Sequence, residues 1–309
     1  MTKNTNLSSS PYRGDKKGAK ILVWIFGIIF TISAAVYQKV TGPTYPFKQD
    51  VTLNGNDYTL KFSRSGETTP KDISKPYIMA LELNEPGINA TINYRRFPTN
   101  DEFKTIPFIF KDGQYEAKLP QQAAAGKLEY SATLSDGNNT YDVPIQVMRF
   151  KDPVPLYWLI PHVLAMFLAM LFSNVTALMA IFNVGKVGIL KEGFWANFNT
   201  KSFVNMTIMT AVFFAIGGLM FGPVVQKFAF GDFWTGIPFG WDLTDNKTLI
   251  AAIFWAIALY MNYKKPSRFW TITAAAVMLA IYAIPHSMFG SELDPETGKV
   301  IQGIIMFRF

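Results

Sequence analysis

The sequence predicts a mixed membrane protein, in which about five transmembrane α-helices carry an inserted all-β domain, an Ig-like sandwich, outside the cytoplasm. Three observations predict this fold class. Only 17% of the 309 residues are charged while 50% are hydrophobic, whereas soluble proteins have about 25% charged residues. Long apolar runs alternate with one polar stretch, residues 43 to 152. Within that stretch apolar and polar residues alternate with a period of two, as they do in strands.

Five apolar segments approach the roughly 20 residues that a helix needs to cross a bilayer. They cover residues 21 to 39, 156 to 182, 203 to 225, 248 to 263 and 269 to 289, and the fourth is short. The first segment could also be a signal peptide cleaved near Ala34 and Ala35. Its apolar run exceeds the 7 to 15 residues or so of a signal core, so a retained anchor is favoured.

Basic residues in the short connections predict the orientation, because Lys and Arg near helix ends stay cytoplasmic. They are Lys16, Lys17 and Lys20 before the first segment, Lys186, Lys191 and Lys201 between the second and third segments, and Lys264, Lys265 and Arg268 between the fourth and fifth. The predicted organisation in the cytoplasmic (inner) membrane is therefore a cytoplasmic tail (1–20), an anchor (21–42), an outer β domain (43–152), a four-helix transmembrane domain (153–289) with an outer loop (226–247), and an outer tail (290–309).

The net charge of +7 follows this topology rather than a nucleic-acid surface. The first 20 residues hold five basic side chains and one acidic one, while residues 43 to 152 hold 13 basic and 14 acidic ones. Anionic lipid headgroups are therefore the expected partner of the basic excess, and no nucleic acid is expected.

Turn dipeptides divide the polar stretch into strands. Asn54-Gly55 and the Asp-Gly pairs at Asp112 and Asp136 suit tight hairpins, because their residues tolerate positive φ. Seven or eight strands without helical periodicity favour a small sandwich of about 100 residues. Pro153 and Pro155 then stiffen the return to the membrane.

Several classes of activity are disfavoured by what the sequence lacks. There is no cysteine, which excludes disulfides and thiolate metal sites. The apolar segments hold almost no ionisable residues, which argues against proton pumps, ion-coupled transporters and intramembrane proteases. No nucleophile motif or phosphate loop is present, so an independent catalytic activity is not expected. Glu292, Asp294 and Glu296 of the tail could bind calcium, although such residues more often form a solvated turn.

The two histidines share one context. His162 and His286 each follow Ile-Pro, and the predicted topology places both at the outer ends of their helices. A proline before each histidine frees a backbone carbonyl and can bend the helix so that it aims the imidazole. The alternative is that each histidine only bonds a backbone group at the membrane interface.

The outer loop is rich in aromatic residues and glycine. It contains Phe228, Phe230, Phe233, Trp234, Phe239 and Trp241 together with Gly231, Gly236 and Gly240. An interfacial aromatic belt is one interpretation. The glycines favour another, in which backbone and rings lie flat against a planar group. Asp242 and Asp245 can cap the following helix, with Asp242 or Thr244 at its start.

This loop resembles the tryptophan-rich segment of the cytochrome c assembly membrane proteins that handle heme. Phe230-Gly231, Trp234, Trp241-Asp242, Asp245 and Leu249-Ile250 follow the order of that family's pattern. Phe230 replaces its leading Trp, Leu243 replaces a Pro, residues 235 to 240 are inserted, and the β domain is additional. The chain as a whole also resembles bacterial membrane proteins without an assigned role.

The resemblance implies a heme-binding or heme-handling protein. His162 and His286 would be the axial ligands, while Trp234, Trp241, Phe239 and Asp242 would surround the macrocycle. The alternative is a non-enzymatic accessory or scaffold subunit that docks a membrane or periplasmic partner through its β domain. Copper handling is a third possibility, because Met166 and Met288 lie close in sequence to the two histidines. The sequence also leaves open that no cofactor is bound.

Overall fold

The chain divides into two compact units in a computed structural model, which describes residues 15–70, 72–182, 200–264, 267–285, 291–298 and 300–302. The helical unit comprises Met1–Val36, His162–Leu219 and Leu249–Ala283, and the β unit comprises Tyr37–Pro161, Met220–Thr248 and Ile284–Phe309. The outer loop and the C-terminal segment therefore belong with the β strands.

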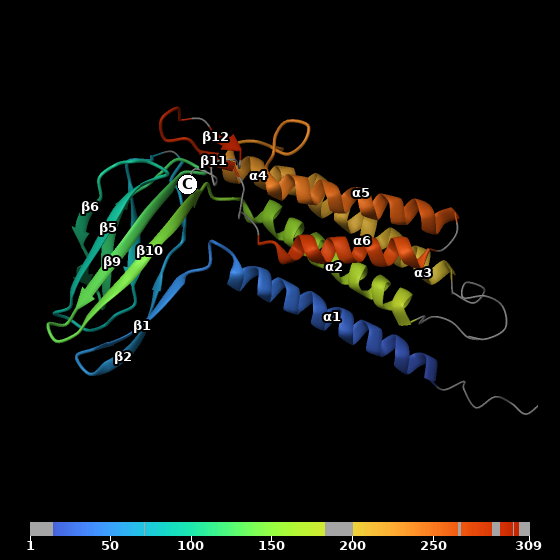
Figure 1. Cartoon of the computed structure of the whole chain (residues 1–309), viewed down its shortest axis with the longest axis horizontal. Helices are drawn as coiled ribbons and strands as arrows, with labels where there is room; N and C mark the ends of the chain where they lie inside the picture. The colour runs from blue at the N-terminus through green and yellow to red at the C-terminus, as the bar shows by residue number, and fades with distance from the viewer. Residues whose placement is uncertain are drawn as a thin grey trace, which may run out of the picture. The chain divides into compact units, whose positions relative to one another are not determined.

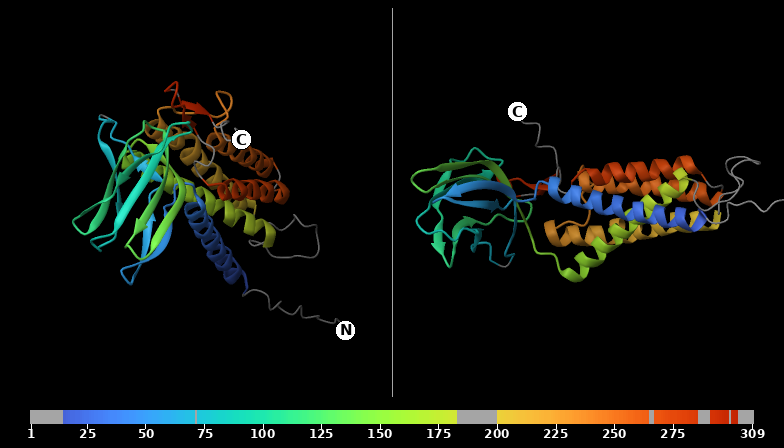
Figure 2. Two further views of the ribbon diagram at one scale, coloured as in Figure 1. Left: turned by 60° about the vertical axis from the view of Figure 1, so that its left-hand side comes forward. Right: turned by 90° about the horizontal axis from the view of Figure 1, so that it is seen from below.

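The helices follow the apolar segments of the sequence. They are α1 (Asp15–Thr41), α2 (Leu156–Phe182), α3 (Thr200–Phe214), a π-helical turn (Ala215–Phe221), α4 (Gly222–Phe230), α5 (Leu243–Lys264) and α6 (Arg268–Ala283). Those of the helical unit run alongside one another (Figures 1 and 2).

Within the described residues, three helices are long and apolar enough to cross a membrane, namely Ile21–Thr41, Leu156–Phe182 and Phe203–Phe230. They correspond to the first three predicted segments. The third continues beyond its predicted end at residue 225, because the π-helical turn leads directly into α4 and Pro223 stands at the start of α4, where proline is tolerated. α5 has 22 residues and α6 has 16.

The fifth predicted segment is longer than the helix found. α6 ends at Ala283, two residues before Pro285, which is consistent with the steric bias against helical conformation before a proline. The remainder of the predicted segment, residues 286 to 289, lies outside the described residues.

Small side chains let the helices of the helical unit approach closely. Trp255 is buried among Ala169, Ala251, Ala258, Ala274 and other residues of α2, α5 and α6. Gly27 of α1 lies so close to α2 that a Cβ at this position would be 2.6 Å from Cγ2 of Val175. Asn174 of α2 also donates to the hydroxyl of Thr31 over 3.0 Å. α1 is therefore packed against α2 as part of this unit.

An asparagine near the C-terminal end of α5 joins three helices. Asn262 donates from Nδ2 to Oγ1 of Thr207 on α3 (3.2 Å) and to Oγ1 of Thr271 on α6 (2.8 Å). Its Oδ1 accepts the backbone N–H of Ser267 over 2.7 Å. Such satisfied amides act as polar ties between apolar helices.

The β unit contains ten strands between residues 47 and 151. They are β1 (Phe47–Leu53), β2 (Asn56–Phe62), β3 (Ser65–Glu67), β4 (Pro76–Leu81), β5 (Asn89–Phe97), β6 (Lys104–Pro107), β7 (Ile109–Lys111), β8 (Gln114–Pro120), β9 (Lys127–Ser135) and β10 (Thr140–Lys151). Seven or eight were expected. β3 and β7 have only three residues each, too few for a period of two to be recognised.

The strands form three sheets that share one core. The orders are β3-β10-β9-β5-β6, β4-β8-β7 and the ribbon β1-β2. Alternate side chains of strands in all three sheets point into a common cluster that includes Phe62, Leu81, Tyr130 and Phe150. A further hairpin, β11 (Ser291–Leu293) and β12 (Val300–Gln302), lies in the C-terminal segment.

Two of the three predicted tight hairpins are confirmed. Asn54 and Gly55 have φ of 51° and 82°, and Asp112 and Gly113 have φ of 51° and 81°, as a two-residue turn of this type requires. At the third, only Gly137 has positive φ (90°), and the turn between β9 and β10 is longer. Here the side chain of Asp136 accepts the backbone N–H groups of Asn138 and Asn139.

Candidate functional site

The outer loop has a defined backbone that is fastened to the first turns of α5. α4 ends at Gly231, whose φ of 97° suits a C-cap glycine. The backbone N–H groups of Thr235 and Gly236 then donate to Oδ2 of Asp245 over 2.6 and 3.1 Å. The next N–H, of Ile237, donates to Oδ1 of Asn246 over 2.7 Å. Three successive N–H groups are thus held by two side chains of one helix.

Asp245 is the centre of this arrangement. Its carboxylate also accepts the hydroxyl of Thr235 (3.1 Å) and the side-chain amide of Gln226 (3.1 Å). Asp245 precedes the predicted fourth membrane segment, and its burial raises the pKa of the carboxyl, while the hydrogen bonds from Thr235 and Gln226 oppose this shift. A Cβ on Gly236 would lie 2.6 Å from Cβ of Asp245, so only glycine fits there.

Asp242 is the N-cap of α5, as one of the two sequence interpretations predicted. Its Oδ1 accepts the N–H of Thr244 (2.8 Å) and of Asp245 (3.3 Å), which are otherwise orphan donors of the first turn. Asp242 is only 3% exposed. Its carboxylate therefore serves the helix, and the structure gives it no exposed surface for a ligand.

The aromatic residues of the loop differ in exposure. Phe239 and Trp241, both predicted to pack a macrocycle, are 77% and 66% exposed. Trp234 is half-buried, and its indole N–H donates to the carbonyl of Ile237 over 3.1 Å. The fixed loop therefore presents the rings of Phe239 and Trp241 outward, while Trp234 helps to close it.

The loop is joined to the β strands by what we call the neck contacts. The Arg149 guanidinium of β10 lies 4.5 Å from the ring centre of Phe230, and the N–H of Asp152 donates to the carbonyl of Ala229 over 3.1 Å. Arg149 is buried, which lowers its pKa, while the charges of Asp242 and Glu292 oppose that effect.

The C-terminal hairpin supplies the remaining neck contacts. Lys127 of β9 forms a buried ion pair with Glu292, and the N–H of Leu293 donates to the carbonyl of Ala125 over 3.2 Å. Burial lowers the pKa of Lys127, and Glu292 opposes the shift. The tail carboxylates thus have different roles. Glu292 is buried in an ion pair, whereas Asp294 accepts hydrogen bonds within its own turn, from the N–H of Glu296 and the hydroxyl of Thr297.

Lys247 holds the backbone just before His286. Its ammonium donates to the carbonyls of Ile284 (2.9 Å) and Pro285 (3.4 Å). This lysine of the second turn of α5 precedes the predicted fourth membrane segment, and burial lowers its pKa to about 8. His286 itself, like Met288, lies outside the described residues. Of the two predicted histidine ligands, the structure therefore describes His162.

His162 has a fixed ring in the helical unit. Its Nδ1 lies 2.9 Å from the carbonyl oxygen of Gly217, which stands in the π-helical turn. A carbonyl is only an acceptor, so Nδ1 carries a proton, and in the neutral imidazole Nε2 is then the unprotonated nitrogen. π-Helical turns free carbonyls from the helical ladder and often mark functional sites. The imidazole therefore has a defined tautomer with Nε2 suited to bind a metal.

Met166 lies one turn after His162 on α2, beside the same glycine. A Cβ on Gly217 would lie 2.9 Å from the sulfur of Met166. The backbone carbonyl of Met166 accepts the hydroxyl of Tyr282 over 3.3 Å. Among the described residues, no three side chains of His, Asp or Glu are grouped so that they could hold a metal ion.

Sequence reasoning did not identify Arg149, Lys127, Lys247 or Gln226. Each looks locally like an ordinary charged or polar residue of a strand or a helix end, and its role depends on a partner far away in the sequence. Gly236 was identified from the sequence as a residue that lets the loop lie flat against a planar group. The structure gives another reason for the glycine, which is its close contact with Asp245.

Comparison of this chain with protein-family models, with curated proteins and with solved structures finds no match.

Proposed function

We propose that this chain is a heme-binding or heme-handling protein that acts at the outer face of the cytoplasmic (inner) membrane. The observation that carries the proposal is the hydrogen bond between Nδ1 of His162 and the carbonyl of Gly217. Histidines that bind metals almost always donate their other ring N–H to a carboxylate, carbonyl or water, which fixes the tautomer and orients the ring. A backbone carbonyl orients His162 in this way.

His286 is the proposed second axial ligand, and Phe239 and Trp241 are proposed to contact the macrocycle. Two neutral imidazoles are a suitable ligand set for heme iron, whose redox chemistry would come from the heme itself. The large exposed ring faces of Phe239 and Trp241 on a fixed loop fit a flat apolar group. Trp234 and Asp242 support the loop in this proposal.

The proposal includes a finer topology than three apolar helices. We propose five membrane-spanning segments, with residues 248 to 263 of α5 and the helix α6 crossing as well, a cytoplasmic N-terminus, and an Ig-like sandwich formed by the β strands outside the cytoplasm. The basic connections and the shared core of the sheets support it.

Visible spectroscopy of the purified chain, before and after addition of heme, tests the proposal. We expect a stoichiometric Soret band that is lost in His162→Ala and in His286→Ala. His162→Gln is the matched control, because its amide can still donate to Gly217 although it is a poor iron ligand. This variant is expected to stay folded and free of heme, whereas His162→Met is expected to bind heme with a shifted spectrum.

A colourless wild-type protein that takes up no added heme would overturn the proposal. Uptake of Cu(I) in place of heme would also overturn it, in favour of a copper site with Met166.

A second candidate is a non-enzymatic accessory or scaffold subunit, favoured by the neck contacts. They join the β strands to the outer loop in one unit, so that a partner bound to the strands would be held in a set position relative to the loop. The exposed edge strand β7, with Ile109 60% exposed, is a possible surface for strand pairing. A stoichiometric partner that still co-purifies with the His162→Ala/His286→Ala variant would favour this candidate.

A further inference from the structure

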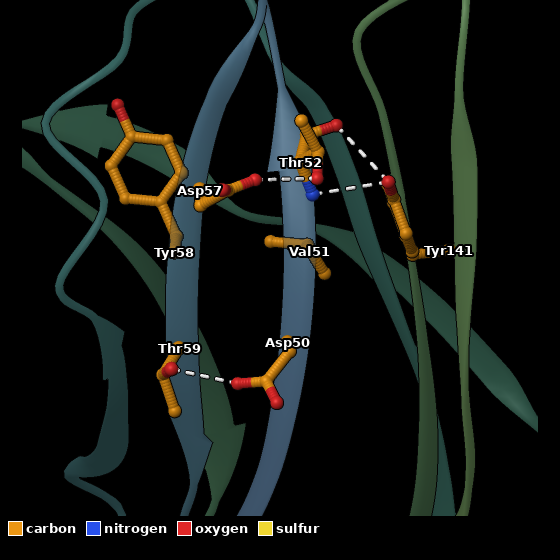
Figure 3. A pocket seen from close by; sticks show the side chains of 7 residues that line it. All are labelled: Asp50, Val51, Thr52, Asp57, Tyr58, Thr59 and Tyr141. Atoms are coloured by element: carbon orange, nitrogen blue, oxygen red, sulfur yellow. Dashed lines mark hydrogen bonds between the residues drawn. The ribbon is translucent and has the colours of Figure 1, made fainter.

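A polar groove lies on the β1-β2 ribbon beside Tyr141 of β10 (Figure 3). It is lined by Asp50, Val51, Thr52, Asp57, Tyr58, Thr59 and Tyr141 and has a volume of about 430 Å³. This volume falls within the range of roughly 300 to 1,000 Å³ that is usual for small-molecule sites. The function proposed above does not involve this groove.

Two carboxylates of the groove are fixed by neighbouring hydroxyls. Asp50 stands opposite Thr59 and Thr52 stands opposite Asp57 across the ribbon. In each pair one carboxylate oxygen accepts the threonine hydroxyl over 2.7 Å (Figure 3). An ionised carboxylate accepts about four hydrogen bonds, so both keep acceptor capacity toward the groove while their positions are set.

Two tyrosines of the groove are fixed through their hydroxyls. Tyr141 of β10 accepts the N–H of Thr52 over 3.0 Å and donates to the Thr52 carbonyl over 3.1 Å (Figure 3). Tyr58 donates to Glu85 over 3.1 Å. Tyr58 pairs with the core residue Val51 and packs against the core, so the ring that a ligand on the face of the two carboxylates can reach is that of Tyr141. Because its hydroxyl is held, little conformational freedom of Tyr141 is lost when a ligand packs against it.

The charges around the groove select a neutral ligand. Asp50 and Asp57 repel anions, and none of the described residues that line the groove is basic. Lys48 and Lys61 stand opposite each other two positions before Asp50 and two after Thr59, so they share that face of the ribbon. Their positive charge opposes binding of a cation to Asp50.

We propose that this groove binds a neutral carbohydrate of one or two sugar rings. The hydroxyls of a sugar donate to the two fixed carboxylates in charge-assisted hydrogen bonds, and one C–H face packs on the ring of Tyr141. The exposed side chains of Thr52 and Thr59 complete the polar surface toward a sugar.

Saturation-transfer NMR on the full chain tests this proposal. The chain is held in lipid nanodiscs, because sugar-based detergents would compete for the groove. The probes are cellobiose and diacetylchitobiose, with glucuronate and putrescine as charged competitors. We expect at least one disaccharide to bind, and Asp50→Ala and Asp57→Ala each to weaken it about tenfold, the effect of losing one strong hydrogen bond of about 1.4 kcal/mol. The charged probes should not compete.

Asp142→Ala is the matched control. Asp142 forms the same kind of cross-strand pair, with Thr133 over 2.8 Å, but does not line the groove. Its affinity for the disaccharide should equal that of the wild type. The proposal is overturned if neither disaccharide binds, if binding persists in Asp50→Ala/Asp57→Ala, or if putrescine displaces the sugar. Each result is read with heme uptake measured separately, since the two proposals are independent.

Discussion

At the scale of single residues, aspartates hold the loops of this protein by accepting backbone hydrogen bonds. Asp136 accepts the N–H groups of Asn54 (2.9 Å), Asn138 (2.8 Å) and Asn139 (2.6 Å), and so ties the tip of the β1-β2 ribbon to the turn between β9 and β10. Asp245 does the same for the outer loop. In both cases one carboxylate accepts several backbone N–H groups that would bond to backbone carbonyls in a sheet or helix.

Asp136 gives the β unit a defined sensitivity to acid. The three N–H groups favour the ionised form and lower the pKa of its carboxyl from 3.8 to about 2. Because the folded-state pKa is depressed, this stabilisation is complete above pH 4 or so and is lost as the pH falls through 2. We expect the melting temperature of wild type to exceed that of Asp136→Asn at pH 5, and the difference to shrink toward pH 2. A difference that is independent of pH would contradict this explanation. Asp142→Asn, whose carboxylate accepts a threonine hydroxyl in the wild type, is the comparison.

Asp245 controls the order of the outer loop. Asp245→Ala leaves the buried N–H groups of Thr235 and Gly236 without an acceptor, at a cost of about 1 to 3 kcal/mol for each group. We expect much faster hydrogen exchange at these two amides and faster proteolysis within residues 231 to 242. Asp232→Ala removes an exposed carboxylate of the same loop and should leave both rates unchanged. Equal rates in the two variants would show that the loop does not depend on Asp245.

At the scale of elements, close helix packing makes α1 a structural member of the helical unit. Gly27→Leu places a side chain where even a Cβ would be 2.6 Å from Val175, so α1 must move away from α2 and the bond between Asn174 and Thr31 is lost. We expect a lower melting temperature, by an amount that corresponds to roughly 1 to 3 kcal/mol. Gly18→Leu in the same helix meets nothing within 4 Å and serves as the control. If both variants melt like wild type, α1 does not contribute to the stability of the unit.

The elements were also the part of the structure that sequence predicted best, because their signals are local. Apolar runs of the right length mark α1, α2 and α3, and Asn54-Gly55 marks the β1-β2 hairpin. The parallel pairing of β3 with β10 joins Ser65 to Arg149, and no local period reveals such a partner. The π-helical turn at Gly217, which positions His162, is likewise invisible in an apolar run. Asp242 was found as a cap because capping acts within three residues.

At the scale of the whole β unit, buried charges decide whether the C-terminal hairpin stays attached. Lys127 and Glu292 have side chains only 14% and 8% exposed. Lys127→Met leaves the Glu292 carboxylate buried without this partner, which typically costs about 3 to 5 kcal/mol. We expect a clear loss of thermal stability and rapid proteolysis within residues 291 to 302, and partial recovery in Lys127→Met/Glu292→Leu.

Arg96→Met is the control for this variant. Arg96 pairs with Asp101 over 2.7 Å in a more exposed position, and such surface pairs contribute about 1 kcal/mol or less. If Arg96→Met and Lys127→Met destabilise the protein equally, the buried pair has no special role in the neck.

The ion pair between Lys127 and Glu292 also constrains the order of biosynthesis. Its partners are 165 residues apart, and the helices α2 to α6 lie between them in the chain. A ribosome therefore completes the strands β1 to β10 and the helices α2 to α6 before Glu292 is made, so Lys127 lacks this counter-charge until the helices have been synthesised. The attachment of the β strands to the C-terminal hairpin thus follows synthesis of the helices, and a chain that stalls before Glu292 would expose an unfinished neck to chaperones and proteases.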